Sequence, residues 1–369
     1  MERCRILVVG AGLAGLALAR ALRRAGFDPE VIERAERWDG GGTGMYLPAN
    51  GVRALRTLGL EAAVAARAAP IPRQRLLDHR GRLLAEIDLR ELWGDVGVCV
   101  ALPRADLHQV LRDGVPVRMG RTVTSLERVD GPVAVRFDDG GDGEYDLVIG
   151  ADGLHSGVRR LAGDRRPPVA VGQQSWRWLS EPDGAPEVTT WTVLLGRGVS
   201  FLTVPMGGGA VYCYADSTGG NGDGDPVGRL RERFAGFAAP VPGLLAQLHD
   251  PARIHAAPIQ QVAAEQWGRG AVVLVGDAAH GMSPNMAEGA SLAFEDAVVL
   301  AASLRGAATV REALAAFVAR RGPRTGWVRA QTHRRDRTRD LPPVLRNLTL
   351  RTLGRRIFRS NYRPLLPPA

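Results

Sequence analysis

The segment between residues 5 and 34 limits the possible folds of this chain more than any other part of the sequence. It begins with Arg-Ile-Leu-Val-Val (residues 5–9), an apolar and β-branched run that is typical of a strand buried on both faces of a parallel sheet. Gly10, Gly12 and Gly15 follow in a G-x-G-x-x-G pattern. In such a pattern the first glycine allows a tight turn, the second lets a pyrophosphate approach the backbone, and the third lets a helix pack closely on the strand. We therefore predict a strand, a turn and a helix that together bind a dinucleotide.

The residues after the glycines complete this unit. Apolar residues recur at helical spacing as far as Gly26, which ends the predicted helix, and Val31 and Ile32 begin a second strand. Glu33 closes that strand, where its carboxylate is placed to accept hydrogen bonds from the ribose hydroxyls of an adenosine. Because a carboxylate repels a 2′-phosphate, the unit favours FAD or NAD over NADP as the bound dinucleotide. The predicted contacts are Gly10, Ala11, Gly12, Leu13, Ala14, Gly15 and Glu33.

Two later segments favour FAD. Residues 145–153 form another apolar strand that ends in an Asp-Gly turn, and residues 271–275 form a third strand, with Asp277 just beyond its carboxyl end, where parallel sheets bind ligands. A long helix-favouring run follows, and its first turn carries Gly289 and Ala290. The free N–H groups at such a helix start would stabilise the negative charge of a reduced flavin.

The order and spacing of these motifs resemble the p-hydroxybenzoate hydroxylase-like family of FAD monooxygenases over residues 5–305. The resemblance implies that the glycine motif holds the ADP part of FAD, that Arg104 contacts the cofactor, and that Asp277 bonds the ribitol chain. The isoalloxazine would border residues 284–290. The chain departs from the family pattern at Ala287, where glycine is common, and at Glu288, where glutamine is common. The further FAD contacts expected from the resemblance are Arg34, Val123, Asp152, Gly276, Pro284, Ala287, Gly289 and Ala290.

The predicted fold class is α/β, with a Rossmann-like parallel sheet that binds FAD, an inserted antiparallel sheet that binds substrate, and C-terminal helices. We expect the FAD-binding part to be built from residues 1–72, 101–164 and 259–305. The substrate part would comprise residues 73–100 and 165–258, and residues 306–369 would be helical.

Alternating β-type runs separated by Gly-rich turns predict the antiparallel sheet between residues 189 and 215. In the family that the chain resembles, this sheet covers the flavin and holds the substrate. Each of its aromatic residues is also a candidate for ordinary core packing. The candidates to line the substrate site are Tyr46, Arg177, Trp191, Phe201, Pro205, Met206, Tyr212 and Tyr214.

The expected chemistry comes from the cofactor, because the sequence has no lysine, no metal-ligand spacing and no paired cysteines. NADH or NADPH would reduce the flavin, and a flavin C4a-hydroperoxide would hydroxylate an aromatic or polyketide-like small molecule. A related dehydrogenase or reductase that inserts no oxygen, and a flavin-binding protein without activity, remain open. A halogenase is disfavoured, because Trp176-Arg-Trp178 lacks the W-x-W-x-I-P pattern and halogenases need a lysine.

The positive charge of the chain is concentrated near its end. The net charge is +9, yet residues 320–363 hold fourteen arginines against two aspartates, which gives +12 there and −3 elsewhere. We interpret this tail as a solvated helical region, with a membrane or nucleic-acid contact left open. The tail prolines would break it into short helices that pack across the pocket side or form a subunit contact. Its apolar stripe would consist of Leu345, Leu348, Leu350, Leu353, Ile357 and Phe358.

The remaining expectations concern the cell and the polar residues near the third strand. Three widely spaced cysteines favour a reducing cytoplasm, and no stretch is apolar enough to span a membrane. We expect a monomer or homodimer whose partner is an aromatic small molecule rather than a nucleic acid. We expect His280 to cap or pack, and Glu295 and Asp296 to be surface or structural residues.

Overall fold

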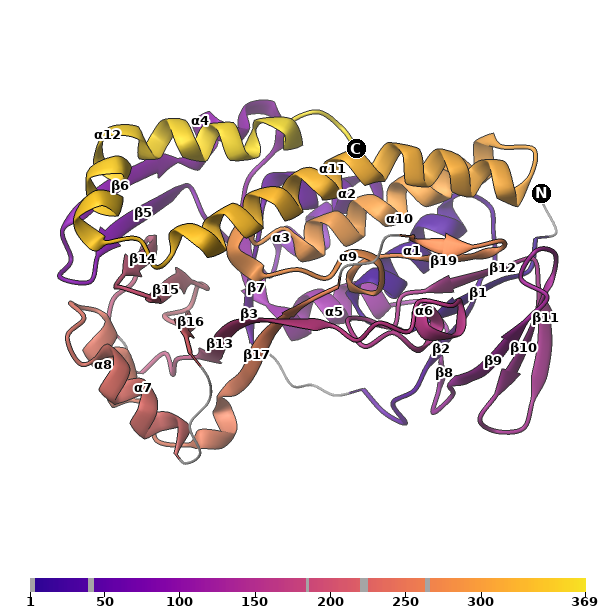
Figure 1. Cartoon of the computed structure of the whole chain (residues 1–369), viewed down its shortest axis with the longest axis horizontal. Helices are drawn as coiled ribbons and strands as arrows, with labels where there is room; N and C mark the ends of the chain where they lie inside the picture. Colours follow the sequence, from indigo (N-terminus) through magenta and orange to yellow (C-terminus); the bar gives the residue numbers. More distant parts are fainter. Residues whose placement is uncertain (1–3, 39–42, 184–185, 220–224, 263–265) are drawn as a thin grey trace.

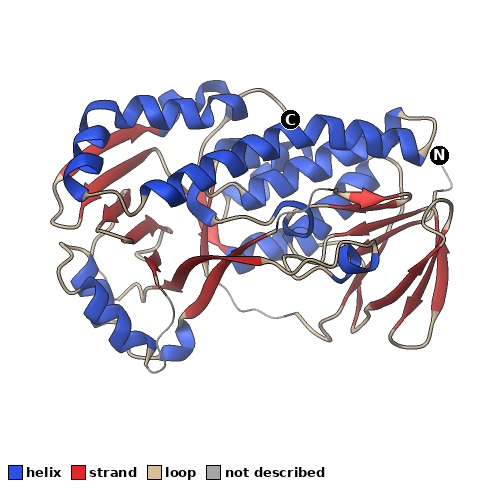
Figure 2. Cartoon of the chain, viewed as in Figure 1, coloured by secondary structure: helices blue, strands red, loops and turns tan. Residues whose placement is uncertain are grey.

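The computed structural model describes the whole chain apart from residues 1–3, 39–42, 184–185, 220–224 and 263–265. A parallel sheet lies at one end of the molecule and a mixed sheet at the other, and long C-terminal helices run along one side of both (Figure 1). Helices and strands contribute to both halves (Figure 2). The α/β fold class predicted from the sequence is confirmed.

The described strands form four sheets. In spatial order, the parallel sheet, to which β18 is added antiparallel at one edge, contains β18 (Gly268–Arg269), β19 (Val272–Leu274), β12 (Leu147–Gly150), β1 (Ile6–Val9), β2 (Glu30–Glu33) and β8 (Arg118–Met119). The mixed sheet contains β17 (His255–Gln261), β13 (Val169–Leu179), β16 (Val211–Thr218), β15 (Val199–Pro205), β14 (Trp191–Leu195), β5 (Arg73–Asp78) and β6 (Leu83–Asp88). Two small sheets contain β11 (Asp142–Tyr145), β10 (Val133–Phe137) and β9 (Val123–Glu127), and β3 (Gly44–Leu47), β7 (Val100–Pro103) and β4 (Ala69–Pro70).

The helices connect and cover these sheets. They are α1 (Leu13–Arg24), α2 (Ala49–Thr57), α3 (Glu61–Ala65), α4 (Leu89–Trp93), α5 (Arg104–Arg112), α6 (Gly157–Leu161), α7 (Pro226–Phe234), α8 (Val241–Ala246), α9 (Asp277–His280), α10 (Gly289–Gly306), α11 (Val310–Thr338) and α12 (Pro343–Tyr362). Short 3-10 turns are η1 (Gly94–Val96), η2 (Pro251–Arg253), η3 (Pro284–Met286) and η4 (Arg363–Leu365).

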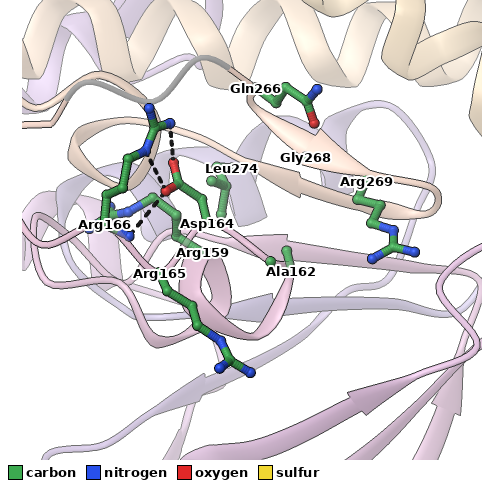
Figure 3. Close-up of a pocket in the computed structure, with 10 residues that line it drawn as sticks. Arg159, Ala162, Asp164, Arg165, Arg166, Gln266, Gly268, Arg269 and Leu274 are labelled. Atoms are coloured by element: carbon green, nitrogen blue, oxygen red, sulfur yellow. Dashed lines mark hydrogen bonds and ion pairs between the residues drawn. The ribbon is translucent and has the colours of Figure 1, made fainter.

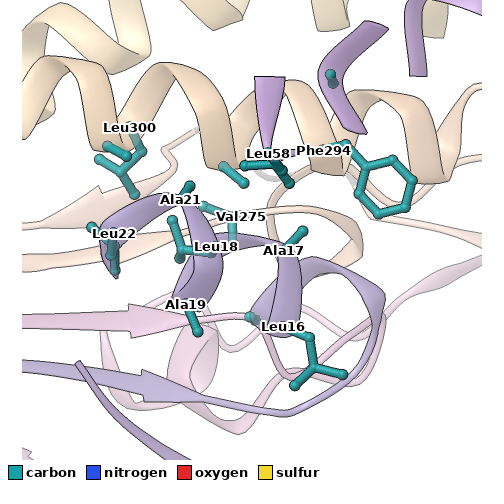
Figure 4. Close-up of a cluster of buried hydrophobic side chains, with 14 of the residues drawn as sticks. Leu16, Ala17, Leu18, Ala19, Ala21, Leu22, Leu58, Val275, Phe294 and Leu300 are labelled. Atoms are coloured by element: carbon teal, nitrogen blue, oxygen red, sulfur yellow. The ribbon is translucent and has the colours of Figure 1, made fainter. Parts of the chain in front are cut away.

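Strand β1 is buried on both faces, as its unbroken apolar sequence predicts. Ile6 and Val8 pack into the cluster that contains α1 and α10, whereas Leu7 and Val9 pack toward the β9–β10–β11 sheet. Figure 4 shows the first of these clusters, with Leu18 and Leu22 of α1 beneath α10. This packing fixes the start of α1 at the carboxyl end of β1, where the glycine motif lies.

The mixed sheet separates two apolar clusters. One of its faces carries Tyr212 and Tyr214 toward the small β3–β7–β4 sheet, and the other carries Cys213 and Ala215 toward α7 and α8. The strand pairs within this sheet are antiparallel except β14 with β5, which is parallel. The inserted sheet is therefore mixed rather than wholly antiparallel, because β5 arrives from residues 73–78, far upstream in the chain.

The C-terminal region is less broken than we expect from its prolines. Pro323 lies within the long helix α11, and Pro343 begins α12, where its missing N–H costs no hydrogen bond. The helices break at Pro342-Pro343 and near Pro364, as predicted, but the pieces between the breaks are long rather than short. Among the described residues, no helix is both long enough and apolar enough to span a bilayer.

A buried ionic network joins α10 to α11. Glu295, Asp296 and Arg321 are at most 2% exposed, and the guanidinium of Arg321 donates to both carboxylates at 2.8 Å. His280 Nε2 lies 2.7 Å from Asp296 Oδ2. Burial favours the neutral form of Asp296, but His280 and Arg321 lower its pKa to about 2. Glu295 and Asp296 were expected to be surface or structural residues. They are structural, and they do not lie at the surface.

Candidate functional site

The glycine motif forms a turn whose outer side is open. Gly10 has φ +104°, and a Cβ there would lie 2.6 Å from the carbonyl oxygen of Ala151. A Cβ at Gly15 would lie 1.8 Å from the carbonyl oxygen of Gly10, so the helix can approach the strand only with glycine at this position. A Cβ at Gly12, in contrast, would meet no atom within 4 Å in the part of the chain that the structure describes. The space beside Gly12 is where a pyrophosphate could approach the start of α1.

Glu33 and His108 hold this turn from its two sides. Glu33 Oε2 accepts a hydrogen bond from Ala11 N at 2.8 Å, and His108 Nε2 lies 3.0 Å from the carbonyl oxygen of Ala11. Burial lowers the pKa of His108, which favours the neutral ring. Sequence reasoning predicted Glu33 but missed His108, which stands outside every motif, one helical turn after Arg104 in α5.

The segments predicted to bind FAD lie next to one another in the structure, in a row that runs from Gly12 through Asp277 to Gly289. A Cβ at Gly276 would lie 2.9 Å from Ala14 Cβ of α1, which brings the turn after β19 against the glycine motif. A Cβ at Gly289 would lie 3.9 Å from Asp277 Oδ1, so the starts of α9 and α10 are adjacent. The Asp277 carboxylate is exposed and has no partner among the described residues. The row from Gly12 to Gly289 therefore offers an open turn, a free carboxylate and a helix start, which fit the pyrophosphate, ribitol and ring of FAD.

The other predicted cofactor residues fall into three groups. Arg34 and Arg104 are exposed near this row, whereas Val123 is buried at the start of strand β9. Asp152 is already engaged, because its carboxylate accepts from the backbone N–H groups of Gly157 and Val158 at the start of α6. Residues at the isoalloxazine end of the row are Pro284 in η3, Ala287 with φ +53°, and Ala290 in the first turn of α10.

Most of the predicted substrate residues come together in one aromatic cluster. The rings of Tyr46 and Trp191 are 4.1 Å apart, and a Cβ at Gly44 would lie 2.5 Å from Tyr212 Cβ. Met286 belongs to the same cluster and Ala287 packs against it, so the cluster borders the isoalloxazine end of the row. Its predicted members are Tyr46, Trp191, Met206, Tyr212 and Tyr214.

Phe201, Arg177 and Pro205 lie elsewhere. Phe201 points to the opposite face of the mixed sheet, where its ring lies 5.3 Å from that of Phe234 in α7, so it does not join the cluster. Arg177 is at the cluster edge, with its guanidinium 5.5 Å from the Tyr214 ring. Pro205 is half-buried at the end of β15. The structure thus places Arg177 near the aromatic cluster and Phe201 outside it.

Several buried polar atoms of the cluster lack partners. Trp191 Nε1, Tyr214 OH and Arg177 Nε have no hydrogen-bond partner among the described residues. Buried polar groups are nearly always hydrogen-bonded in folded proteins, and those that are not require an explanation such as a ligand or bound water. These atoms are donors that a polar substituent on an aromatic ligand could use.

Glu288 is a buried acid at the isoalloxazine end of the row. Its Oε2 accepts from Asn50 Nδ2 at 2.9 Å, while its Oε1 has no partner among the described residues. Burial raises its pKa to about 8, and Glu295 adds to this effect, while Asn50 and the arginines of α11 oppose it. Glu288 is therefore neutral at pH 7 and does not cancel the positive end of α10.

We expect the stability of the protein to depend on pH through Glu288. Its folded pKa lies above the ordinary glutamate value of 4.5, so its contribution to stability is complete below that pH and is lost as the pH rises through about 8. Glu288→Gln keeps the neutral form at every pH. Urea unfolding between pH 5 and pH 8 should show the wild-type free energy of unfolding falling relative to E288Q, by up to about 1.4 kcal/mol per pH unit.

Glu232→Gln is the matched control, because Glu232 is exposed on α7. Its stability should follow the wild type across the same pH range. Parallel pH dependences for the wild type and E288Q would show that Glu288 is not a neutral acid in the folded protein.

Two cavities lie apart from the candidate site. One, of about 780 Å³, lies between α6 and β18–β19 and is lined by Arg159, Arg165 and Arg269, with Arg166 paired to Asp164 (Figure 3). The other, of about 1110 Å³, lies between α11 and β17–β19. None of the predicted cofactor or substrate residues lines either cavity.

Comparison with known proteins yields a family and close relatives. Residues 3–328 match the model of the family described as FAD binding domain. The chain is 35% identical over 339 residues to the aurachin C monooxygenase/isomerase of Stigmatella aurantiaca, covering 89% of this chain and 88% of the relative. It is 32% identical over 329 residues to the FAD-dependent urate hydroxylase of Klebsiella pneumoniae, covering 86% and 85%.

A solved structure agrees over nearly the whole length. The crystal structure of Klebsiella pneumoniae HpxO complexed with FAD and uric acid superposes with a TM-score of 0.90 at 28% sequence identity, covering 98% of this chain and 97% of the other. The similarity includes both sheets and the C-terminal helices.

Proposed function

Because the chain belongs to the FAD binding domain family, in the class of FAD-dependent monooxygenases that resemble p-hydroxybenzoate hydroxylase, we propose that it hydroxylates an aromatic or polyketide-like small molecule. Its cofactor is FAD, and NADH or NADPH serves as the electron donor. The observation that carries the proposal is the row from Gly12 through Asp277 to Gly289, which ends beside the aromatic cluster.

The row gives each part of the cofactor a partner of suitable chemistry. The open turn at Gly12 accepts the pyrophosphate, Glu33 faces the adenosine ribose, and the free carboxylate of Asp277 accepts from the ribitol hydroxyls. When bound, FAD would take a hydride from the nicotinamide, activate dioxygen and supply one oxygen atom to an electron-rich carbon. The N–H groups of Gly289 and Ala290 stabilise negative charge at that end.

The aromatic cluster orients the substrate and excludes water. Tyr46, Trp191 and Tyr212 provide apolar walls that shield the reacting atoms from solvent. Trp191 Nε1 and Tyr214 OH donate hydrogen bonds to polar substituents of the ring, and Arg177 favours a substituent with partial negative charge. This combination suits an electron-rich ring with hydroxyl or carbonyl groups, and relatives named for urate and aurachin C oxidation support a ring substrate of this kind.

The cellular setting follows from the same properties. We propose a reducing, cytoplasmic location, which the unpaired state of Cys4, Cys99 and Cys213 supports. The proposed assembly is a monomer or homodimer, and the proposed ligands are small molecules rather than nucleic acids.

Oxygen labelling tests the proposal directly. Purified protein with FAD should oxidise NADH or NADPH faster when the right aromatic compound is added, and the product should carry one atom from labelled dioxygen. A panel of phenols, aryl acids and fused-ring heteroaromatics would locate the substrate class. Product formed without oxygen, or product free of label, would instead favour a dehydrogenase or reductase.

A further inference from the structure

The start of α12 exposes large apolar side chains. Val344 is 84% exposed, Leu345 55% and Leu348 59%. Val344, Leu345 and Leu348 lie at helical spacing and share one face of α12, and Leu341, 37% exposed, lies just before the helix begins. Of the apolar stripe expected in this tail, only Leu345 and Leu348 lie on this face, whereas Phe358 is buried in the aromatic cluster. A contiguous exposed apolar patch such as this one indicates an interaction site.

The same face becomes cationic further along the helix. Arg351, Arg355, Arg356 and Arg359 follow Leu348 at spacings that keep them on this side. Arg355 donates to the carbonyl oxygen of Glu86, and Arg359 pairs with Glu91. Arg351 and Arg356 are exposed and have no partner in the described part of the chain. No acidic residue occurs between Leu341 and the end of the sequence.

We propose that this apolar–arginine face of α12, formed by Leu341, Val344, Leu345, Leu348, Arg351 and Arg356, binds the surface of an anionic lipid bilayer. A helix with leucines and arginines on its exposed side lies in the plane of the membrane interface, with the apolar side chains among the acyl chains and the arginines at the headgroups. Anionic headgroups supply the negative charge that the face itself lacks.

Other occupants fit this face less well. A second copy of the chain, docked by a two-fold contact through the leucines, would leave Arg351 and Arg356 without acidic partners from this segment, because no acidic residue occurs between Leu341 and the end of the sequence. Duplex nucleic acid would satisfy Arg351 and Arg356 but would leave Val344 and Leu348 in water. A neutral bilayer would satisfy the leucines alone.

The helix also connects the membrane face to the candidate site. On its inner side, Phe358 and Tyr362 pack into the aromatic cluster, and Tyr362 OH donates to the carbonyl oxygen of Met286 at 3.0 Å. The tail therefore packs against the aromatic cluster, and that this is the pocket side stays a prediction. A bound membrane would lie one helix away from the aromatic cluster.

Vesicle flotation with the full-length protein tests the proposal. We expect binding to phosphatidylcholine vesicles that contain phosphatidylglycerol, little binding to phosphatidylcholine alone, and release at high salt. Replacing Arg351 and Arg356 by glutamine should weaken binding roughly 30-fold at low salt, at about 1 kcal/mol per arginine. Replacing Leu345 and Leu348 by glutamine should weaken it roughly tenfold or more, since each leucine loses its burial in the acyl region.

Matched control variants remove side chains of the same kind outside the proposed membrane face. R305Q/R311Q removes two exposed arginines, Arg305 at the end of α10 and Arg311 at the start of α11, and V169Q/V318Q removes two exposed valines. Both should bind vesicles like the wild type, and all variants should keep their FAD and melting temperature. Absence of binding to the anionic vesicles would overturn the proposal. Two further results, in protein that does not bind vesicles, would also overturn it. One is a dimer that the L345Q/L348Q substitutions dissociate. The other is salt-sensitive binding of duplex DNA that the R351Q/R356Q substitutions abolish.

Discussion

Gly12→Val should yield a folded protein that has lost its FAD. A Cβ at this position meets no atom of the described residues within 4 Å, and Gly12 has φ −73°, which any residue adopts. The substitution therefore costs the fold little. The valine methyl groups would occupy the space in which the pyrophosphate must approach the N–H groups at the start of α1. We expect the ratio of bound FAD to protein, measured from the flavin absorbance, to fall from near one to near zero.

Gly131→Val is the matched control for this experiment. Gly131 also has open space around its Cβ position and lies in the loop between β9 and β10, away from the glycine motif. This variant should retain FAD and melt like the wild type. If G12V kept a full complement of FAD, the open turn at Gly12 would not be the pyrophosphate site. The assignment of the row from Gly12 to Gly289 as the FAD site would then be wrong.

The FAD row was predictable because local sequence specifies each of its parts. An apolar run followed by glycines at fixed spacing encodes a strand, a turn and a close-packed helix, and the structure has β1 and α1 at these positions. The same holds for β19 and Asp277. Parallel sheets bring the carboxyl ends of their strands to one edge, so residues far apart in sequence, such as Gly12 and Asp277, were expected to meet.

Side-chain direction in the mixed sheet was not predictable from composition. Phe201 pairs with Ala215, whereas Leu202 pairs with Tyr214. Residues that pair directly share a face, so Phe201 lies with Ala215 against α7 and away from Tyr214. A shift of one residue in register would reverse this arrangement, and aromatic content alone does not fix the register.

Long-range polar partners were also beyond the reach of sequence patterns. Glu288 meets Asn50, and Glu295 meets Arg321, across separations of 238 and 26 residues. An acidic pair on a helix usually indicates a solvated face, and an arginine-rich tail indicates the same. Neither pattern alone predicted a buried ion pair, because burying such charges becomes favourable only when the acid and the arginine are brought together.

Arg321→Met should destabilise the protein strongly. Arg321 is fully buried and donates to Glu295, Asp296 and the carbonyl oxygen of Leu292. Methionine matches much of its volume but leaves the carboxylates without this partner in the interior. Removing one member of a buried ion pair typically costs about 3–5 kcal/mol. We expect a loss of this size in the free energy of unfolding, measured by urea titration at pH 7 with excess FAD.

The same variant should also loosen the FAD site, because Asp296 Oδ2 accepts a hydrogen bond from Gly276 N at 3.0 Å. Without Arg321, Asp296 is less firmly held, and the turn that presents Asp277 loses part of its support. FAD should therefore bind more weakly to R321M than to R311M, a control in which an exposed arginine of the same helix is replaced. A stability loss below about 1 kcal/mol, a value typical of surface ion pairs, would mean that the α10–α11 network does not hold the two helices together.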